Sequence, residues 1–389
     1  MNIAFFLDAK LVKKEDEYYT TGAVTEEYLQ RHKLTQEDKL TVICREQEND
    51  TTSTRKSLAE GENILFRTFN SYKQIIKNRK TIEKIIIEND FIEIKLPTVI
   101  GLLAMHYVIK YKKNHIVEMV GCPLDAYWYY GNFLGKVIAP IMCLLNKYYI
   151  KKAKNLIYVT KEFLEKRYPT KGKYQYCSDV DIDQCDDNIL EKRLGKIKNK
   201  TGRYKFGLIG ALHTNYKGHK TVIKAFSKLN GKIDFEIHFL GYGNNEKWME
   251  MAEEYGIKEK VFFNGTLPHS EINKWLDDID IYLIPSLTEG MPRALIEAMS
   301  RACPAIGTKV GGIPEILSDK MLIKKKADRE LSELVLELVQ DKKLQEQCAI
   351  ENFEKAKEFE KDELLMKREE FYEEILREVF NEKSFTSRK

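Results

Sequence analysis

The chain has 389 residues, 43% of them hydrophobic and 32% charged, and its 64 Lys+Arg against 60 Asp+Glu leave a formal net charge of +4. This length exceeds one ordinary hydrophobic core and predicts two domains, because a domain averages about 150 residues. The near balance of charge argues against a nucleic-acid-binding protein, which needs a concentrated cationic face. An aromatic content of 11% argues against a disordered chain.

The N-terminus lacks the basic head and the apolar length of a signal peptide, so the chain is predicted to stay in the cytoplasm. The longest apolar stretch, Val137–Leu145, contains Pro140 and is far shorter than the roughly 20 residues of a membrane span. The seven cysteines form no CxxC pair and are predicted to be reduced and mostly buried. A Cys177–Cys185 disulfide is the alternative.

Apolar periodicity in the first half alternates between strand and helix. Thr25–His32 has helical spacing, and further helical patterns separate the apolar runs. The runs predicted as strands are Ile3–Leu7, Leu40–Cys44, Ile64–Phe66, Phe91–Ile94, Ile116–Val120 and Asn155–Val159. Strands that alternate with helices predict a parallel sheet covered on both faces.

Between Ser178 and Lys200 the pattern fails, because an acidic cluster is followed by a lysine-rich stretch, and this segment is predicted to be a linker. The alternation then restarts. Its predicted strands are Tyr204–Ile209, Phe235–Leu240, Val261–Phe263, Ile281–Ile284 and Ala305–Ile306, and its predicted helices are Gly218–Leu229, Glu246–Tyr255, Ser270–Asp277 and Pro292–Arg301. Such sheets bind ligands outside the carboxyl ends of their strands, so two in tandem predict an inter-domain cleft.

The domain boundaries are predicted at residues 1–190 and 191–355, followed by a C-terminal helix within 356–389 that returns toward the first domain. Apolar residues between Glu351 and Phe380 recur at helical spacing, which predicts a packed amphipathic helix or, alternatively, a partner-binding helix. They are Leu364, Leu365, Phe371, Tyr372, Ile375, Leu376 and Val379.

Charge is divided unevenly between the halves. Residues 1–200 hold 34 basic and 27 acidic side chains, whereas residues 201–389 hold 30 and 33. The excess lies in residues 101–180, with 13 basic and 5 acidic side chains. These lysines are either solvated helix faces or a surface attracted to anionic lipid headgroups on the inner face of the cell membrane.

The segment from Pro285 to Met299 carries the strongest chemical signal. A strand ends at Pro285, Glu289 lies in a polar loop, Gly290 permits close backbone approach, and Pro292 suits the first position of a helix that contains Glu297. The free amides of a helix start bind anions. The two glutamates can then reach opposite ends of a nucleotide diphosphate-sugar whose charge lies at the helix start. The alternative is two solvated glutamates near a helix N-terminus.

Two further strand-end loops are predicted at the same edge of the second sheet. The segment Gly207–Gly218 follows the first strand of the second domain and brings Gly210 and Lys217 to a strand-to-helix turn. A lysine there can neutralise a leaving diphosphate, although a solvated helix-start lysine has the same pattern. Gly241 and Gly243 follow another strand, but a lone GxG is usually a turn.

These segments resemble retaining glycosyltransferases of the GT-B fold, namely glycosyltransferase family 4, also called glycosyl transferases group 1, of the bacterial capsule and exopolysaccharide type. The resemblance lies in "YKGHKTVIKAF", "FLGYGN", "VFFNGTLPHSEINKWLDDIDIYLIPS", "PSLTEGMPRALIEAM" and "GTKVGGIPEIL". It is specific over about residues 204–317 and diffuse over 1–190. It implies two Rossmann-like, doubly wound parallel-sheet domains facing across a cleft, the first for the acceptor and the second for the nucleotide-sugar.

The resemblance also implies residue roles. Glu289 would contact hydroxyls of the donor sugar, Glu297 the ribose hydroxyls and Lys217 the diphosphate, with Glu289 and Lys217 as the catalytic candidates. The segment after Gly290 would cradle phosphate and sugar through its amides, and a glycine loop would approach the donor from the first domain. The implied nucleotide-sugar-binding positions are completed by Met291, Pro292, Arg293, Ala294, Gly22, Gly210, His213, Gly241, Gly243 and Leu267.

Two departures from the family pattern matter. Ala211 stands where family members usually carry a phosphate-binding arginine, and Arg293 or His213 is the candidate replacement. The segment from Ile116 to Cys122 lacks the histidine that many members place near the sugar. Glu118 and Asp125 are candidates for an acceptor or sugar contact there.

The expected reaction is transfer of a hexose from a nucleotide donor, expected to be UDP-linked, to a glycan or a lipid-linked acceptor in cell-surface polysaccharide synthesis. The resemblance implies retention by front-side displacement, with no enzymic nucleophile, no metal and no cofactor besides the nucleotide-sugar co-substrate. Asp179-x-Asp181-x-Asp183 resembles a metal-binding DxD but falls in the predicted linker. The alternatives are a catalytically silent partner subunit of a heteromeric transferase and a nucleotide-sugar 2-epimerase.

Overall fold

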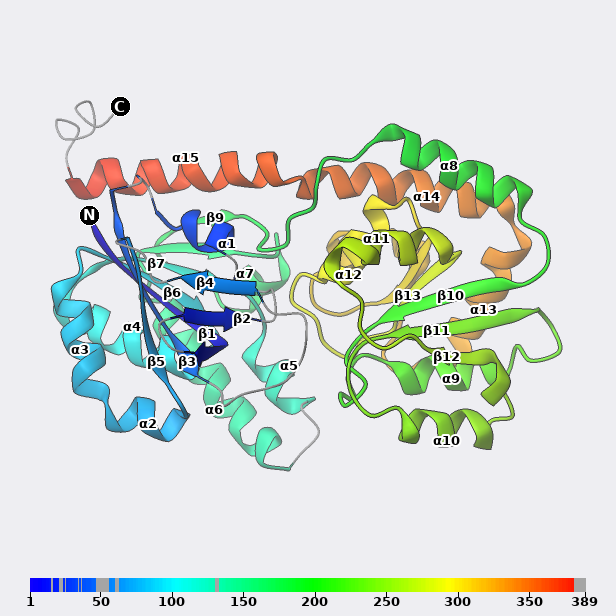
Figure 1. Ribbon diagram of the computed structural model, residues 1–389, viewed down its shortest axis with the longest axis horizontal. Coiled ribbons are helices and arrows are strands. Elements are labelled where there is room, and N and C mark those ends of the chain that lie inside the picture. The colour runs from blue at the N-terminus through cyan, green and yellow to red at the C-terminus, as the bar shows by residue number, and fades with distance from the viewer. Residues whose placement is uncertain are drawn as a thin grey trace.

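The computed structural model describes residues 1–14, 17–20, 24, 26–33, 35, 37–46, 56–59, 63–129 and 133–380. It has two lobes side by side, each built around one sheet, and the last helices run along the top of both (Figure 1). Each sheet is parallel at its centre, as the alternation of strand and helix predicts. The prediction of two Rossmann-like domains is therefore confirmed.

Within the described residues, the first sheet has nine strands, of which β5-β3-β1-β6-β7-β8-β9 run parallel in that spatial order. The far end of β1 extends beyond a register shift and pairs antiparallel with β2, which pairs with β4. Sequence analysis missed β2, β4 and β9. The strands are β1 Asn2–Lys14, β2 Glu17–Thr20, β3 Lys39–Glu46, β4 Lys56–Ala59, β5 Ile64–Phe69, β6 Phe91–Leu96, β7 Asn114–Met119, β8 Asn155–Tyr158 and β9 Lys173–Tyr176.

Short connections and longer helices link these strands. The helix predicted at Thr25–His32 is the shorter α1, and α6 contains Pro140. The helices are α1 Glu26–Gln30, α2 Tyr72–Lys77, α3 Arg79–Glu88, α4 Val99–Tyr111, α5 Pro123–Trp128, α6 Phe133–Ile150 and α7 Phe163–Arg167.

The second sheet is parallel throughout, in the order β12-β11-β10-β13-β14-β15. Its strands are β10 Tyr204–Ile209, β11 Phe235–Leu240, β12 Val261–Phe263, β13 Ile281–Ile284, β14 Ala305–Thr308 and β15 Leu322–Ile323. Its helices are α9 His219–Ser227, α10 Glu246–Glu254, α11 His269–Asp278, α12 Arg293–Ser300 and α13 Asp328–Gln340. Figure 1 shows α11 and α12 above this sheet and α9 and α10 below it.

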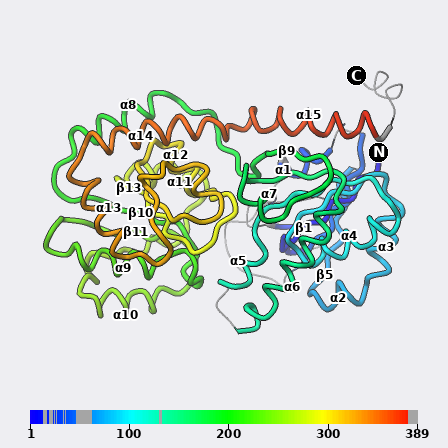
Figure 2. Tube along the Cα trace, turned by 180° about the vertical axis from the view of Figure 1, so that it is seen from behind, coloured from blue at the N-terminus to red at the C-terminus, as the bar shows by residue number. Residues whose placement is uncertain are grey.

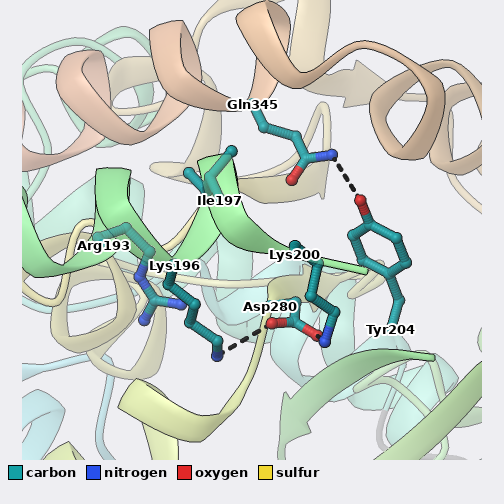
Figure 3. Close-up of a pocket in the computed structure, with 7 residues that line it drawn as sticks. All are labelled: Arg193, Lys196, Ile197, Lys200, Tyr204, Asp280 and Gln345. Atoms are coloured by element: carbon teal, nitrogen blue, oxygen red, sulfur yellow. Dashed lines mark hydrogen bonds and ion pairs between the residues drawn. The ribbon is translucent and has the colours of Figure 1, made fainter. Parts of the chain in front are cut away.

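The segment predicted as a linker, Ser178–Lys200, contains a helix, α8 Asp187–Asn199. Its Arg193 is buried and donates to the carbonyl oxygens of Leu276, Ile279 and Arg301, which anchors α8 to the second domain. The sequence pattern missed this helix because two lysines of the stretch pair with a carboxylate of the second domain. Figure 3 shows them: Lys196 and Lys200 lie 3.0 and 2.5 Å from the carboxylate of Asp280.

The C-terminal segment predicted as one amphipathic helix is broken in two. Helix α14 (Lys342–Ala356) lies on the second domain, a short turn at Lys357–Phe359 interrupts it, and α15 (Lys361–Phe380) crosses to the first domain. Both views show α15 running along the first lobe (Figures 1 and 2). Its buried face contributes Leu364, Phe371, Tyr372, Ile375 and Leu376 to the core of that domain.

The two domains also share a core at the cleft. The hydrophobic cluster of the first domain includes Met291, Val310 and Ile313 of the second. The carboxylate of Glu315 accepts hydrogen bonds from the backbone amides of residues 161–163, at 2.6 to 3.1 Å. The loops after the second sheet thus contact the first domain directly.

The structure also bears on the predictions for the cysteines and for the longest apolar stretch. All seven cysteines are free, so the alternative Cys177–Cys185 disulfide is not formed. Among the described residues, one helix is long and apolar enough to cross a membrane by length and composition, and it is α6, which includes the stretch Val137–Leu145.

Candidate functional site

The strand order of the second sheet reverses between β10 and β13, and the loops that follow these two strands meet there. The first loop runs from Gly210 to Gly218 and the second from Pro285 to Pro292. They are hydrogen-bonded to each other, since the amide of Leu287 donates to the carbonyl of Tyr216 at 2.7 Å. A switch point of this kind is where open α/β sheets bind ligands.

An ion pair occupies the centre of these loops. Lys217 Nζ lies 2.9 Å from Glu289 Oε1 and 3.2 Å from Oε2. The hydroxyl of Ser286 also donates to Glu289 Oε1, at 2.6 Å. The Lys217 side chain is 25% exposed and that of Glu289 is 9% exposed. Burial opposes the charged lysine, but the attraction of Glu289 outweighs it and raises the pKa of Lys217. The structure thus brings together the two residues predicted as catalytic.

Glycines allow the loops to pack this closely. A Cβ at Gly210 would lie 2.9 Å from the Lys217 side chain, and one at Gly241 would lie 2.1 Å from the Gly210 carbonyl oxygen. Gly218 has φ +93°, and a Cβ there would lie 2.3 Å from the carbonyl oxygen of Pro285. Gly243 has φ +120° beside the amide of His213. Gly241 and Gly243 therefore shape the same site edge as Lys217.

Gly290 lies in close contact with the backbone of the first domain. A Cβ there would lie 2.5 Å from the carbonyl oxygen of Val120, which follows β7. The amide of Gly312 donates to the Gly290 carbonyl at 2.9 Å. The sequence predicts that this glycine lets the backbone approach a ligand, whereas in the structure the close neighbour is the opposite wall of the cleft.

Helix α12 begins directly after this loop, with Pro292 at its N-cap. Met291 and Pro292 are buried, Ala294 is half-buried, and Arg293 is exposed. Glu297 lies one to two turns into the helix and is buried, with its Oε1 3.5 Å from His269 Nε2 of α11. A hydrogen bond with Glu297 raises the pKa of His269.

The two candidates for replacing the arginine absent at Ala211 lie in different places. His213 is exposed in the loop after β10, its ring 4.9 Å from that of Tyr242. Arg293 Nη2 is instead 3.4 Å from the carbonyl of Asp179, and its Nη1 is 3.9 Å from the carboxylate of Asp181. His213 therefore shares the loop of Lys217, whereas Arg293 joins α12 to the segment between the domains.

The candidate residues of the first domain are engaged in structural contacts. Glu118 of β7 is buried, paired with Arg368 of α15, and 3.1 Å from Lys95 of β6. Burial disfavours its charge, but Arg368 and Lys95 outweigh that effect and hold its pKa well below the usual range. Its position gives no support to an acceptor contact. Asp125 is paired with Arg167 at 2.5 Å.

Gly22 and Leu267 are the remaining residues predicted to bind the nucleotide-sugar. Gly22 lies outside the described residues, beyond β2 rather than directly after the first strand. Leu267 is half-buried in the loop between β12 and α11. Sequence reasoning missed Ser286 and His269, although both lie in the segments that carried the resemblance.

In the described part of the chain, no group of three or more His, Cys, Asp or Glu side chains is placed to hold a metal ion. Of the acidic cluster in the predicted linker, Asp181 faces two arginines, Arg31 at 3.6 Å and Arg293 at 3.9 Å. These cations belong to different domains, so the cluster contributes to the contact between them.

Comparisons with known proteins agree with this geometry. The family model described as Glycosyl transferases group 1 matches residues 191–355. Protein CapJ of Staphylococcus aureus is 32% identical over 394 residues, which cover 98% of each chain. The putative colanic acid biosynthesis glycosyltransferase WcaL of Salmonella typhimurium is 34% identical over 112 residues, 27% of this chain and 28% of its own.

The fold is shared with solved structures at low sequence identity. Anabaena HepE in complex with UDP-glucose superposes with a TM-score of 0.64 at 14% identity, over 97% of this chain and 99% of that one. Together with the two switch-point loops and the full-length relative, this shows that the chain belongs to the glycosyl transferases group 1 family and has the GT-B fold.

Proposed function

We propose that this chain is a retaining hexosyltransferase of capsule or exopolysaccharide synthesis, which moves a hexose from a UDP-sugar to a glycan or lipid-linked acceptor. The names of WcaL and of the HepE complex with UDP-glucose support the pathway class and the donor. The observation that carries the proposal is the Lys217–Glu289 pair beside the start of α12.

The leaving group of such a reaction is a nucleotide diphosphate, which is expelled without a protonated carboxyl and needs positive charge at its oxygens. An ammonium has three N–H donors, and Glu289 accepts from Lys217 at two oxygens, so one donor remains for a phosphate. The first amides of α12 have no acceptor one turn earlier in the helix and add a second anion-binding element. Lys217 and α12 thus stabilise the departing charge.

The two glutamates bind the uncharged ends of the donor in this proposal. Glu289, fixed by Ser286 and Lys217, accepts from hydroxyls of the hexose, and Glu297 of α12 accepts from the ribose hydroxyls. The acceptor hydroxyl attacks from the face that the diphosphate leaves and passes its proton to the departing diphosphate oxygen, so the anomeric configuration is retained. Because Lys217 and α12 supply the positive charge, transfer is expected to persist in a chelating buffer.

Donor identity is tested by thermal unfolding of the purified chain with a panel of UDP- and GDP-sugars, because a ligand of the native state raises Tm. A UDP-hexose should produce the largest shift, and E297Q should abolish most of it. Transfer is then measured with E289Q, which should be nearly inactive, against E250Q on exposed α10 as the matched control. Unchanged transfer in E289Q, or a product of inverted configuration, would refute the proposal.

The second candidate is a catalytically silent partner subunit, which the alanine at position 211 favours. A silent subunit has no donor hydrolysis or transfer by itself but restores activity to a partner. The two functions are separated by assaying the purified chain alone, where transfer by the wild type and its loss in E289Q exclude the silent subunit.

A further inference from the structure

Helix α6 has its apolar side facing outward. Its large apolar side chains are exposed, Phe133 by 82% and Leu144 by 67%. The residues that it buries are mostly small or polar. The exposed set, called here the α6 face, is Phe133, Leu134, Val137, Ile141, Leu144, Leu145 and Tyr148, and the buried set is Gly135, Ala139, Met142, Asn146 and Ile150.

The α6 face is one continuous stripe. At roughly 100° per residue, its seven side chains fall within an arc of about 120°. Soluble monomers rarely expose a contiguous apolar stripe of this kind, and such surfaces mark a contact with another molecule or with a membrane. Trp128, at the end of the neighbouring α5, is also exposed. Aromatic side chains such as Trp128 and Tyr148 favour the boundary between lipid and water.

The charge along α6 and in the chain segments that flank it has a single sign. Residues 126–161 contain no Asp or Glu and six lysines. Lys136 and Lys147 lie beside the apolar arc on the helix, and Lys151 and Lys152 follow its end, all exposed. Lysines at the edge of an apolar stripe are complementary to anionic lipid headgroups, whereas the rim of a protein interface usually mixes both signs of charge.

We propose that α6 is an interfacial membrane-binding helix, which lies flat in the headgroup region of an anionic bilayer with the α6 face toward the acyl chains. The buried side of α6 packs on the first domain, which holds the helix along the surface rather than across the bilayer. Figure 1 places α6 at the bottom of the first lobe, away from α15.

This surface adjoins the boundary between the domains. Tyr129, at the end of α5, has its ring 4.8 Å and its hydroxyl 3.3 Å from Lys325 Nζ of the second domain. Docking through α6 therefore brings the cleft close to the bilayer. If the proposed transferase function holds, a lipid-linked acceptor reaches the cleft from this side.

Vesicle flotation tests the proposal with the purified chain. Vesicles of phosphatidylcholine with 30% phosphatidylglycerol, a composition of roughly that of an anionic leaflet, should bind the wild type, and pure phosphatidylcholine should bind it much less. Substituting the apolar stripe in I141Q/L144Q should weaken binding at least ten-fold. Each of K147Q and K151Q should weaken it by roughly five-fold, with the loss removed at high salt. Emission of Trp128 should shift to shorter wavelength on binding.

Matched variants on the opposite side serve as controls. K192Q/K198Q on α8 and I350Q on α14 change exposed side chains of the same types, and both should bind vesicles like the wild type. Equal binding by I141Q/L144Q, or concentration-dependent dimerisation lost in that variant without vesicle binding, would overturn the proposal. The assay needs no sugar donor. Donor-induced stabilisation should be the same in wild type and I141Q/L144Q, so failure of the membrane proposal is distinguishable from failure of the transferase proposal.

Discussion

Each domain places a cation–carboxylate cluster toward the carboxyl ends of its central strands, and the two clusters differ in their access to water. In the second domain, Lys217 and Glu289 lie on loops, and the lysine is a quarter exposed. In the first, Glu118 and Lys95 are register partners on β7 and β6, and Arg368 of α15 covers them. The Arg368 and Glu118 side chains are only 5% and 4% exposed.

This difference in exposure distinguishes a cluster that can bind a ligand from a buried cluster that stabilises the fold. A charge removed from water is held by its partner, and removing that partner leaves an uncompensated buried charge. A partly exposed pair can exchange one contact for a phosphate oxygen at a small cost in solvation. Similar residue types in similar positions of two related sheets therefore serve different purposes, and substitutions can test this.

The largest effect is expected at Arg368. R368A removes the arginine paired with buried Glu118 and should lower the free energy of unfolding by about 3–5 kcal/mol. Urea denaturation measures this loss. R377A, which changes an exposed arginine of the same helix, should alter stability by less than about 1 kcal/mol. Equal stability of the two variants would mean that the buried cluster does not hold α15.

The next effect is expected at Lys217 and should appear in activity rather than stability. K217A removes the group proposed to stabilise the leaving diphosphate, and kcat should fall by about 100- to 1000-fold. Steady-state transfer assays measure it, with urea denaturation in parallel. K220A, an exposed lysine of the following helix turn, is the control and should retain activity. A large loss of stability with normal kcat would instead make this pair structural too.

A smaller effect concerns Glu93, which lies 2.6 Å from His32 next to the buried cluster. Burial, reinforced by the charge of Glu118, raises the pKa of Glu93 to about 8. Burial, with Arg31 beside it, lowers the pKa of His32 well below its usual value. At neutral pH the native state thus holds a proton on Glu93 that the unfolded chain releases.

The Glu93 contribution to stability should therefore fall as pH rises from the unfolded pKa of about 4.3 toward 8, by roughly 1 kcal/mol per pH unit. Neutral His32 contributes the opposite slope below its unfolded pKa of about 6.5, so the fall appears above that pH. E93Q cannot release the Glu93 proton and should give a flatter profile in urea denaturation between about pH 6.5 and 8. E88Q on the exposed end of α3 should keep the wild-type slope. Identical slopes in E93Q and wild type would show that Glu93 is ionised in the native state.

The smallest effect is expected at His269. Its hydrogen bond to Glu297 raises its pKa, so at lower pH the charged imidazole holds the carboxylate proposed to bind ribose. Donor affinity of the wild type should rise a few-fold as pH increases through this pKa, and H269A should lack the rise. Titration of UDP-hexose by calorimetry measures it, with H106A, which changes an exposed histidine of α4, as the control. A wild-type affinity that is independent of pH would argue against competition at Glu297.

The sequence predicts the second domain more closely than the first. Strands β10, β11, β12 and β13 have the predicted bounds, because each is a short buried run between polar loops. The antiparallel β2 and β4 were missed, since β1 continues far beyond its apolar run and pairs with them there. Helix α8 was missed because its lysines look like a solvated stretch until Asp280 is placed beside them.

The candidate site residues likewise differ in how well the sequence predicts their surroundings. Lys217 and Glu289 were predictable because each lies in a short loop after a recognisable strand, and a switch point brings such loops together. The surroundings of Glu118 were not, because Arg368 is 250 positions away along the chain and no local pattern links them. The sequence likewise did not predict that the apolar face of α6 is exposed, since the apolar stretch alone does not say which side of the helix is buried.

The return of α15 to the first domain has a consequence for synthesis. Translation produces the strands of that domain first, but part of its core and the Arg368 charge that pairs with Glu118 come from residues 361–376. At roughly 5–20 residues per second, the ribosome needs on the order of 10 to 40 seconds between the two. During that interval the first domain lacks α15 and cannot complete its fold. The second domain can form meanwhile, so the order of maturation runs opposite to the order of the chain.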